Sequence, residues 1–246
     1  MNEYGLIGYP LGHSFSKQYF TEKFERENIS NAVFEAFPIP SIEDFPTLLK
    51  QHPNLKGLSV TIPYKEQILK YIDELSDEVK AIGATNSIKI KDNKLTAFNT
   101  DMVGFRESFK KGLRPHHTKA LVLGTGGASK AVQYVLQQLN IDFLVVTRSV
   151  LNDKKFISYA DVSQELLKEY TVIINSTPVG MWPNENVCPG IPYEFLSADH
   201  YLYDLVYKPA ETLFLQKGKE RGATIQNGYE MLLIQAEESW RIWNDL

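Results

Sequence analysis

Residues 121–136 read LVLGTGGASKAVQYVL, and they give the clearest indication of how this chain folds. A short apolar run, typical of a buried strand, leads into a segment whose apolar residues repeat at helical spacing. Between the two lie Gly124, Gly126 and Gly127. Glycines at such a junction let the backbone approach a pyrophosphate, which the N-terminus of the following helix also attracts. The spelling is GxGGAS rather than GxGxxG, yet strand and helix stand where a dinucleotide-binding loop needs them.

The next predicted strand, 143–147, ends beside residues that favour one dinucleotide over another. Arg148 and Ser149 follow it, about 20 residues beyond the glycines, where an NAD site would place an acid for the ribose hydroxyls. A guanidinium and hydroxyl groups suit the 2′-phosphate of NADP instead. The simpler alternative is that Arg148 is a solvated residue at a strand end. Together with the glycine loop, this pair predicts NADP.

Strand-like and helix-like segments alternate on both sides of the loop. Strands are expected at 4–9, 32–37, 58–62, 120–123, 143–147, 171–175 and 200–206. Such alternation predicts mainly parallel sheets with helices on both faces. Residues 86–98 interrupt it with a polar and apolar alternation around Asp92-Asn93, which is typical of a hairpin. Because a new series of strands starts at 120, the sequence predicts two sheets and two domains.

The composition is that of an ordinary globular protein without disulfides or metal clusters. The 246 residues carry a formal net charge of −4, which gives no electrostatic basis for binding nucleic acid or an anionic membrane. Cys188 is the single cysteine, and the five histidines lack metal-binding spacing. The first residues lack the basic stretch of a signal peptide, and no apolar run approaches the roughly 18 residues of a membrane span. We expect a reduced, cytoplasmic protein.

Residues 59–68, SVTIPYKEQI, place a lysine directly beyond a buried-looking strand. Pro63 stops the strand and suits the first position of a helix, and Ile68 and Leu69 continue at helical spacing. Lys65 is therefore expected in the first turn of a helix, although the positive end of the helix dipole favours acids there. It is either a solvated surface residue or a lysine whose neutral form is favoured for a purpose.

Several short motifs converge on one family. SVTIPYK, Asn99-Thr-Asp101 and GTGGAS, in this order, resemble shikimate dehydrogenase. Further segments that resemble motifs of this family are His13-Ser-Phe-Ser16, Ala84-Thr-Asn86, Asn175-Ser-Thr-Pro-Val-Gly-Met181, Asp204-Leu-Val-Tyr207 and Gly228-Tyr-Glu-Met-Leu-Leu-Ile-Gln235. The resemblance spans nearly the whole chain, and the shared order makes it far more specific than any single motif.

The resemblance implies reversible NADP-dependent reduction of 3-dehydroshikimate to shikimate, a step of aromatic amino-acid biosynthesis. It implies an α/β fold of two domains with an interdomain cleft. An N-terminal mixed-sheet α/β substrate domain would comprise residues 1–101 and 226–246, and a Rossmann-like doubly wound NADP domain would comprise residues 102–225. The expected partner is a small-molecule substrate, bound by a monomer or homodimer, with no nucleic acid and no membrane.

The same resemblance assigns roles residue by residue. Lys65 and Asp101 match positions that hold the ring hydroxyls, and the chemistry of the reaction makes them the expected catalytic pair. The residues that match substrate contacts are Ser14, Ser16 and Tyr207 at the carboxylate, and Thr61, Asn86 and Gln235 at the ring hydroxyls. The residues that match cofactor-binding positions are Asp77, Gly124, Thr125, Gly126, Gly127, Ala128, Thr147, Arg148, Ser149, Leu205 and Gly228. No metal is implied.

Three departures from the family pattern leave substrate preference and cofactor strength open. Lys17 stands where proline is usual, Tyr19-Phe20 where His-Asn is common, and Thr147 where asparagine usually precedes the arginine. The reaction itself does not depend on these positions.

The implied chemistry asks for the residue types that this sequence supplies. Hydride transfer to a ketone needs a proton donor for the alkoxide, and Lys65 can give that proton or stabilise the charge. A helix N-terminus would lower the pKa of Lys65, and a nearby Asp101 would raise it. A small polyhydroxylated carboxylate needs many neutral hydrogen-bonding side chains. On their own, Asp101, Ser14 and Ser16 could equally be helix caps.

Three other functions stay open at the level of sequence. A quinate/shikimate dehydrogenase that uses NAD is the nearest alternative. A non-catalytic NADP-sensing regulator on the same fold would have no use for Lys65 and Asp101 together. A folate-type dehydrogenase of similar architecture would not need Ser14, Ser16 and Gln235 together.

Overall fold

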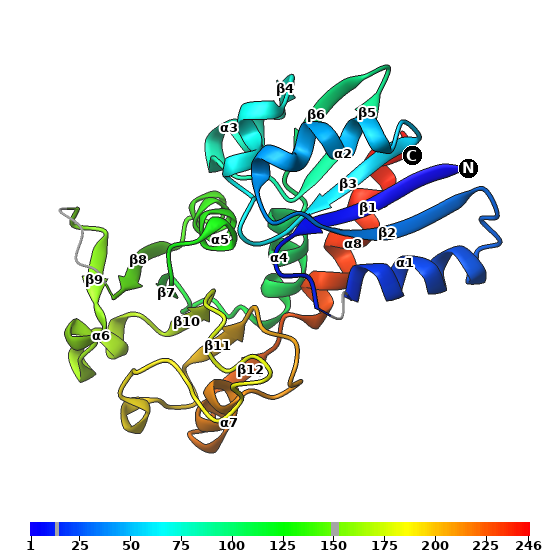
Figure 1. Cartoon of the computed structure of the whole chain (residues 1–246). Coiled ribbons are helices and arrows are strands. Elements are labelled where there is room, and N and C mark those ends of the chain that lie inside the picture. The colour runs from blue at the N-terminus through cyan, green and yellow to red at the C-terminus, as the bar shows by residue number, and fades with distance from the viewer. Residues whose placement is uncertain (13–14, 149–152) are drawn as a thin grey trace. The chain divides into compact units, whose positions relative to one another are not determined.

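The chain divides into two compact units. A computed structural model describes residues 1–12, 15–148 and 153–246. Unit 1 comprises Met1–Thr100 with Ala236–Leu246, and unit 2 comprises Asp101–Gln235 (Figure 1). Each unit has its own six-stranded sheet and its own core.

The second division lies ten residues later than the sequence suggested. Residues 226–235 belong to unit 2 rather than to the substrate-side unit. The reason is local packing, because strand β12 (Thr224–Gln226) extends the second sheet and Met231 packs against Gly104. Helix α8 (Tyr229–Trp243) therefore starts in one unit and ends in the other.

The sheet of unit 1 is mixed, as the resemblance implied. Its strands are β1 (Asn2–Gly8), β2 (Ala32–Pro38), β3 (Leu55–Val60), β4 (Glu74–Leu75), β5 (Ser87–Lys91) and β6 (Lys94–Phe98). They lie in the order β2-β1-β3-β5-β6-β4, with β3–β5 and β5–β6 antiparallel and the other pairs parallel. β5 and β6 form the predicted hairpin, and its turn residues Asp92 and Asn93 have φ of 52° and 57°, which Asp and Asn tolerate well.

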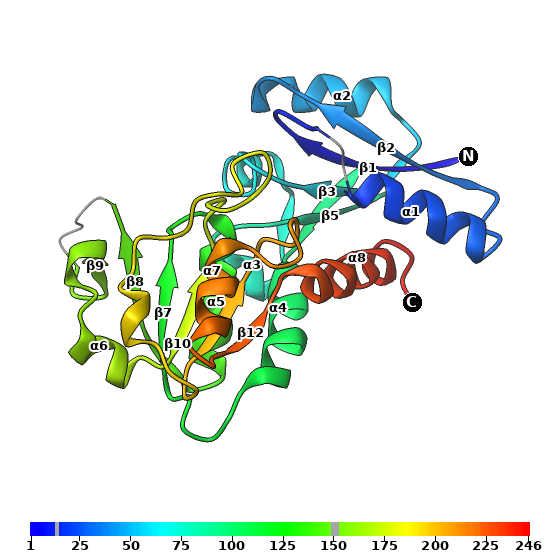
Figure 2. The same cartoon turned by 90° about the horizontal axis from the view of Figure 1, so that it is seen from below.

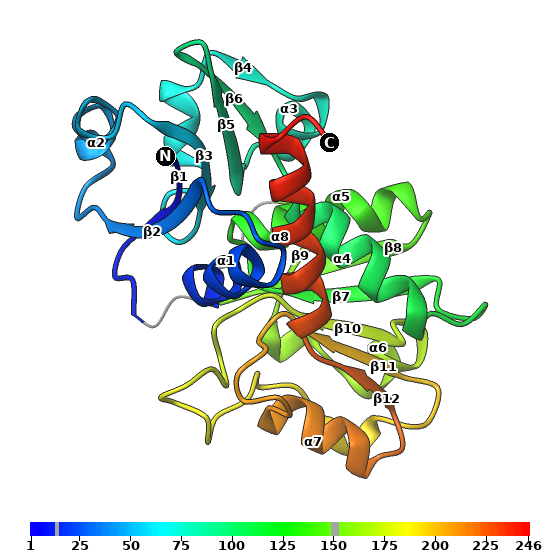
Figure 3. The ribbon, with the colours of Figure 1, turned by 90° about the vertical axis from the view of Figure 1, so that its right-hand side faces the viewer.

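Helices cover both faces of this sheet. They are α1 (Phe15–Arg26), η1 (Ile42–Asp44), α2 (Phe45–Gln51), η2 (Gln67–Tyr71), α3 (Asp77–Ile82) and the C-terminal part of α8, where η marks a 3₁₀ helix. Side chains alternate along a strand. Tyr4 and Leu6 of β1 therefore join an aromatic core with α1 and α8, whereas Ile7 joins a second core with α2 and η2. Figure 3 shows α1 and α8 next to each other, and Trp240 and Trp243 are the α8 residues of this aromatic core.

The segment after β3 differs from the predicted helix. Residues 62–66 form successive turns and η2 starts at Gln67, so Lys65 precedes the helix instead of lying in its first turn. The cause is the hydrogen-bond spacing, since Tyr64 N–H bonds to the C=O of Thr61, three residues back. A three-residue repeat is tighter than the α-helical one. Lys65 therefore lies in a turn that precedes a 3₁₀ helix and not in the first turn of an α-helix.

The sheet of unit 2 is wholly parallel and doubly wound (Figure 2). Its strands are β7 (Lys119–Leu123), β8 (Asp142–Thr147), β9 (Phe156–Ser158), β10 (Val172–Asn175), β11 (Tyr201–Asp204) and β12. From β7 the chain adds β8 and β9 on one side, then β10, β11 and β12 on the other. The strand order thus reverses at β7, and sheets of this kind bind ligands at the carboxyl ends of the strands beside the reversal.

Helices also cover both faces of the second sheet. They are α4 (Asp101–Phe109), η3 (Lys110–Gly112), α5 (Gly127–Gln138), η4 (Tyr159–Asp161), α6 (Gln164–Glu169), η5 (Tyr193–Phe195), α7 (Leu213–Glu220) and the N-terminal part of α8. Leu202 of β11 joins a core with α6 and α7, whereas Tyr201 and Tyr203 contact Phe105 and Phe109 of α4 on the opposite face. Among the residues that the structure describes, no helix is both long and apolar enough to cross a membrane.

Candidate functional site

The glycine loop lies at the reversal of strand order in unit 2. Gly124 follows β7 with φ 106°, a conformation that other residues rarely adopt, and its N–H bonds to the C=O of Val146 at 3.0 Å. Gly126 is the N-cap of α5, and a β-carbon there would meet no atom of the described residues within 4 Å. The first N–H groups of a helix lack intrahelical partners. The loop thus combines open space with backbone donors, which fits a pyrophosphate.

A second loop, residues 175–181, backs the glycine loop. A β-carbon on Gly124 would lie 2.8 Å from Cγ2 of Thr177 and 3.0 Å from Oγ of Ser176. The N–H of Ser176 bonds to the C=O of Leu123 at 3.0 Å, and its Oγ bonds to the same oxygen at 2.6 Å. The two loops therefore meet at the carboxyl ends of β7 and β10, and a larger residue at 124 would push them apart.

Asp204, the last residue of β11, is a fully buried acid that contacts the second loop. Its Oδ1 accepts from Nδ2 of Asn175 at 2.9 Å and from the N–H of Val206 at 3.0 Å, and its Oδ2 accepts from Oγ1 of Thr212 at 2.6 Å. Oδ1 of Asn175 in turn accepts from the N–H and Oγ1 of Thr177 at 3.1 and 2.6 Å. Burial raises the pKa of the Asp204 carboxyl to about 6, against the opposing effect of the hydrogen bonds that it accepts.

Leu205 and Gly228, both predicted cofactor contacts, lie side by side in unit 2. A β-carbon on Gly228 would lie 2.2 Å from the carbonyl oxygen of Leu205, so only glycine fits there. Their backbones are held by hydrogen bonds from Leu205 N–H to Asn175 C=O at 2.9 Å and from Gly228 N–H to Val206 C=O at 3.2 Å. Tyr207 follows on the same segment, and burial raises the pKa of its phenol.

The remaining cofactor predictions are spread more widely. Thr147 ends β8, and Arg148 follows it as an exposed residue. Ser149 lies outside the described residues, as does Ser14. Asp77 is exposed at the start of α3 in unit 1, where it pairs with Lys80 at 2.8 Å, and this contact lowers the pKa of Asp77.

In unit 1, a buried polar cluster fixes the segment that carries Lys65. The C=O of Lys65 accepts from the N–H of Thr85 at 2.8 Å. The next residue, Asn86, donates from Nδ2 to Oγ1 of Thr100 at 2.9 Å and accepts the N–H of Thr100 at 2.6 Å. Oγ1 of Thr100 also lies 2.9 Å from Oγ of Ser239 on α8. Lys65 is half-buried, while the other four residues are buried.

Asp101 begins α4 and is buried, with 6% of its surface exposed. One turn later, a β-carbon on Gly104 would lie 2.4 Å from the carbonyl oxygen of Met231 and 3.2 Å from Cβ of Gln235. Gln235 is also buried, and its Nε2 donates to the C=O of Leu232 at 2.9 Å. Asp101 and Gln235 therefore lie on two helices that pack closely through a glycine.

The other substrate predictions lie in unit 1. Thr61 follows β3, and its N–H bonds to the C=O of Ile7 at 2.9 Å. Ser16 lies in the first turn of α1. Among the departures from the family pattern, Tyr19 donates its hydroxyl to Glu237 of α8.

Several residues that organise these segments received no role from the sequence, although four of them lie inside the motifs that resemble the family. They are Thr100, Ser239, Asn175, Thr177, Asp204 and Thr212. The available signal was a polar residue directly at the end of an apolar strand, as with Asp204 after YLY. From the sequence alone, such a residue would be interpreted as solvent-exposed, and only the fold shows that it is buried.

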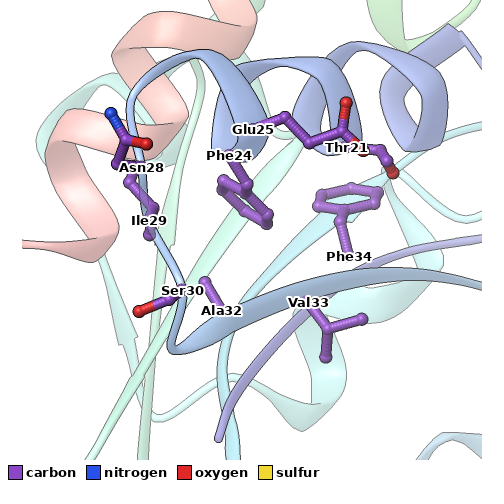
Figure 4. A pocket seen from close by; sticks show the side chains of 9 residues that line it. All are labelled: Thr21, Phe24, Glu25, Asn28, Ile29, Ser30, Ala32, Val33 and Phe34. Carbon is purple, nitrogen blue, oxygen red and sulfur yellow. The ribbon is translucent and has the colours of Figure 1, made fainter.

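A surface pocket of about 420 Å³ lies between α1 and β2 (Figure 4). Phe24 and Phe34 contribute aromatic rings to it, Glu25 lies on α1, and Asn28 lies in the turn that follows this helix. No predicted site residue lines it. Over the described parts of the chain, no group of three His, Cys, Asp or Glu side chains could hold a metal ion.

Comparison with known proteins gives consistent results. Residues 6–88 match the shikimate dehydrogenase substrate binding domain. The chain is 34% identical to a shikimate dehydrogenase (NADP(+)) of Caldicellulosiruptor saccharolyticus, an alignment that covers 100% of this chain and 93% of the relative. The fold is similar to that of shikimate 5-dehydrogenase from Thermus thermophilus in complex with NADP(H) and shikimate, with TM-score 0.86, 31% identity and coverage of 100% and 94%. It is also similar to shikimate 5-dehydrogenase from Listeria monocytogenes in complex with shikimate and NAD, with TM-score 0.87, 25% identity and coverage of 100% and 92%.

Proposed function

The chain belongs to the shikimate dehydrogenase family, and we propose that it catalyses the reversible NADPH-dependent reduction of 3-dehydroshikimate to shikimate. The observation that carries the proposal is the Asn86–Thr100 pair in the buried polar cluster. On one side of this pair, Thr85 holds the backbone of Lys65, and on the other side Asp101 follows Thr100 in the chain. Within unit 1 this network fixes the backbone that carries Lys65, and proton transfer requires a well-positioned donor.

Lys65 is proposed as the general acid, with Asp101 as its acidic partner. When bound, NADPH supplies the hydride. The Lys65 ammonium donates its proton to the ketone oxygen as negative charge develops there, and takes it back in the reverse direction.

The substrate contacts are proposed from neutral side chains. Ser14, Ser16 and Tyr207 would bind the carboxylate, and Thr61, Asn86 and Gln235 the ring hydroxyls. Since Thr100 occupies one donor and the acceptor of the Asn86 amide, that amide is held in one orientation. A preset amide rejects substrates that lack the matching hydroxyl, because its polar group would then be left unpaired.

The cofactor contacts are proposed from unit 2 with one exception. Residues 124–128 would bind the pyrophosphate, residues 147–149 the 2′-phosphate, and Leu205 with Gly228 the nicotinamide side. The open space at Gly126 and the exposed Arg148 support this assignment. Asp77 is the exception, a proposed cofactor contact from unit 1.

A panel of steady-state assays tests the proposal. NADPH and NADH are each mixed with 3-dehydroshikimate, and NADP and NAD are each mixed with shikimate or quinate, while absorbance at the nicotinamide band is followed. We expect the highest kcat/KM with NADPH and 3-dehydroshikimate, and a kcat at least about a hundredfold lower for Lys65→Met protein purified in parallel. Higher kcat/KM with quinate and NAD would assign the chain to the alternative dehydrogenase. Tight NADPH binding without turnover of any substrate would make it a cofactor sensor.

A further inference from the structure

We propose that Asp204 is a positioning residue for the cofactor, whose carboxylate holds residues 175–181 in the conformation that supports the glycine loop. The inference rests on the proposed function, because it takes the glycine loop to be the pyrophosphate site. Asp204 acts through another residue and needs no contact with the cofactor itself.

The contacts form a continuous path from the acid to the glycine loop. Asp204 accepts from Nδ2 of Asn175, and Nδ2 also donates to the C=O of Val179, which closes the loop on itself. The Asn175 carbonyl oxygen then receives both donors of Thr177. Thr177 is the residue that a β-carbon on Gly124 would touch first. If the Asn175 amide rotated, its oxygen would no longer accept the two hydrogen bonds from Thr177, and Thr177 would no longer be held against Gly124.

The acid also fixes which way the Asn175 amide faces. An amide can be turned by half a rotation with little change in shape, so its orientation depends on its partners. An unprotonated carboxylate accepts but does not donate, which selects the NH₂ end of Asn175 and directs the oxygen to Thr177. The N–H of Val206 and the hydroxyl of Thr212 hold the carboxylate in place.

Burying an acid at this position costs free energy of folding. Complete burial opposes the charged form, as the raised pKa of Asp204 shows. A well-packed apolar residue is often as stable or more stable at such a site. An acid that costs stability, yet satisfies three donors next to the predicted nucleotide loop, is explained by what it holds in place.

The experiment compares three variants with the wild-type protein by NADPH fluorescence titration and by hydrogen exchange of residues 175–181. Asp204→Ala should weaken NADPH binding at least about tenfold, because the binding conformation of the loop is no longer the favoured one. Asp204→Asn should bind within about threefold of wild type, since its Oδ1 can still accept from Asn175 and Val206. Ser108→Ala is the matched control, because it removes a buried hydrogen bond to Tyr203, 2.7 Å long, from the opposite face of the same strand. It should leave NADPH binding and the exchange of residues 175–181 unchanged.

If Asp204→Ala does not fold, Asn175→Ala takes its place in the experiment. It removes the loop side of the same contact, and we expect the same loss of NADPH affinity and faster exchange over residues 175–181. Folded Asn175→Ala or Asp204→Ala protein that binds NADPH within twofold of wild type would overturn the proposal. Equal losses in the Ser108→Ala control would also overturn it, because they would reflect general destabilisation. If wild-type protein binds no NADPH, the proposed function fails, whereas the exchange data still test the positioning.

Discussion

The buried acid at the end of β11 predicts an unusual dependence of stability on pH. The pKa of Asp204 is 3.8 in a model peptide and about 6 in the folded chain, because burial favours the protonated form. A raised pKa in the folded state means that the stabilising contribution is complete below pH 3.8 and is lost as the pH rises through about 6. At about 1.36 kcal/mol per pKa unit, the difference between 3.8 and 6 corresponds to about 3 kcal/mol.

The change that isolates this contribution is Asp204→Asn. The variant has no group to titrate at this position, so its free energy of unfolding relative to wild type should rise by about 3 kcal/mol between pH 3 and pH 7, then level off. The carboxamide alters other contacts too, but those terms shift the whole curve without changing its slope. His117 and His200, whose pKa values burial lowers, titrate in both proteins and cancel in the difference.

Urea unfolding followed by circular dichroism at a series of pH values measures this difference directly. Ser108→Ala serves as the control, because its offset from wild type should be the same at every pH. A difference between Asp204→Asn and wild type that is flat with pH, or that falls as the pH rises, would refute the reasoning. Such a result would mean that the hydrogen bonds from Asn175, Val206 and Thr212 outweigh the desolvation of the carboxylate.

Three further predictions concern the site and the core. Lys65→Met should lower kcat at least about a hundredfold while changing KM within about tenfold. In a double-mutant cycle, the effects of Lys65→Met and Asp101→Asn on kcat should not be additive. A near-normal kcat would mean that Lys65 is a solvated surface residue and not the proton donor. Arg148→Ala should weaken NADPH binding by about 1–3 kcal/mol and leave NADH binding nearly unchanged, whereas equal losses in the two titrations would place the arginine elsewhere. Gly57→Ala should lower the free energy of unfolding by about 1–3 kcal/mol, because its β-carbon would lie 2.4 Å from the ring of Trp243. The control is Gly190→Ala, whose β-carbon would have no described atom within 4 Å and which should have little effect in the same urea titration.

The sequence was informative where structure depends on neighbouring residues. The glycine loop joins a strand to a helix within sixteen residues, so its local pattern predicted β7, α5 and the turn between them. The hairpin of β5 and β6 was predicted for the same reason, because its signal is the turn itself. The segment with Lys65 was predicted as an α-helix because α and 3₁₀ helices place apolar residues at overlapping intervals, and only backbone hydrogen bonds separate them.

The parts that the sequence did not predict depend on residues far apart in the chain. Thr100 and Ser239 meet although 139 positions separate them, and nothing near either residue indicates the other. Asn175 and Asp204 are 29 positions apart and pair only because β10 and β11 are neighbours in the sheet. The return of the chain to unit 1 was placed too early for a similar reason, since the packing of Met231 on Gly104 is invisible before the helices are assembled.

The split composition of unit 1 has a consequence for the order in which a ribosome completes the two units. Residues 1–100 emerge first, yet their aromatic core lacks Trp240 and Trp243 until the last stretch of helix α8 has been made. Unit 2 is one uninterrupted segment and can close its sheet as soon as β12 has been synthesised. The unit that is translated first is therefore finished last, and during that interval Tyr4, Phe20 and Phe34 offer an apolar surface to chaperones or to other nascent chains.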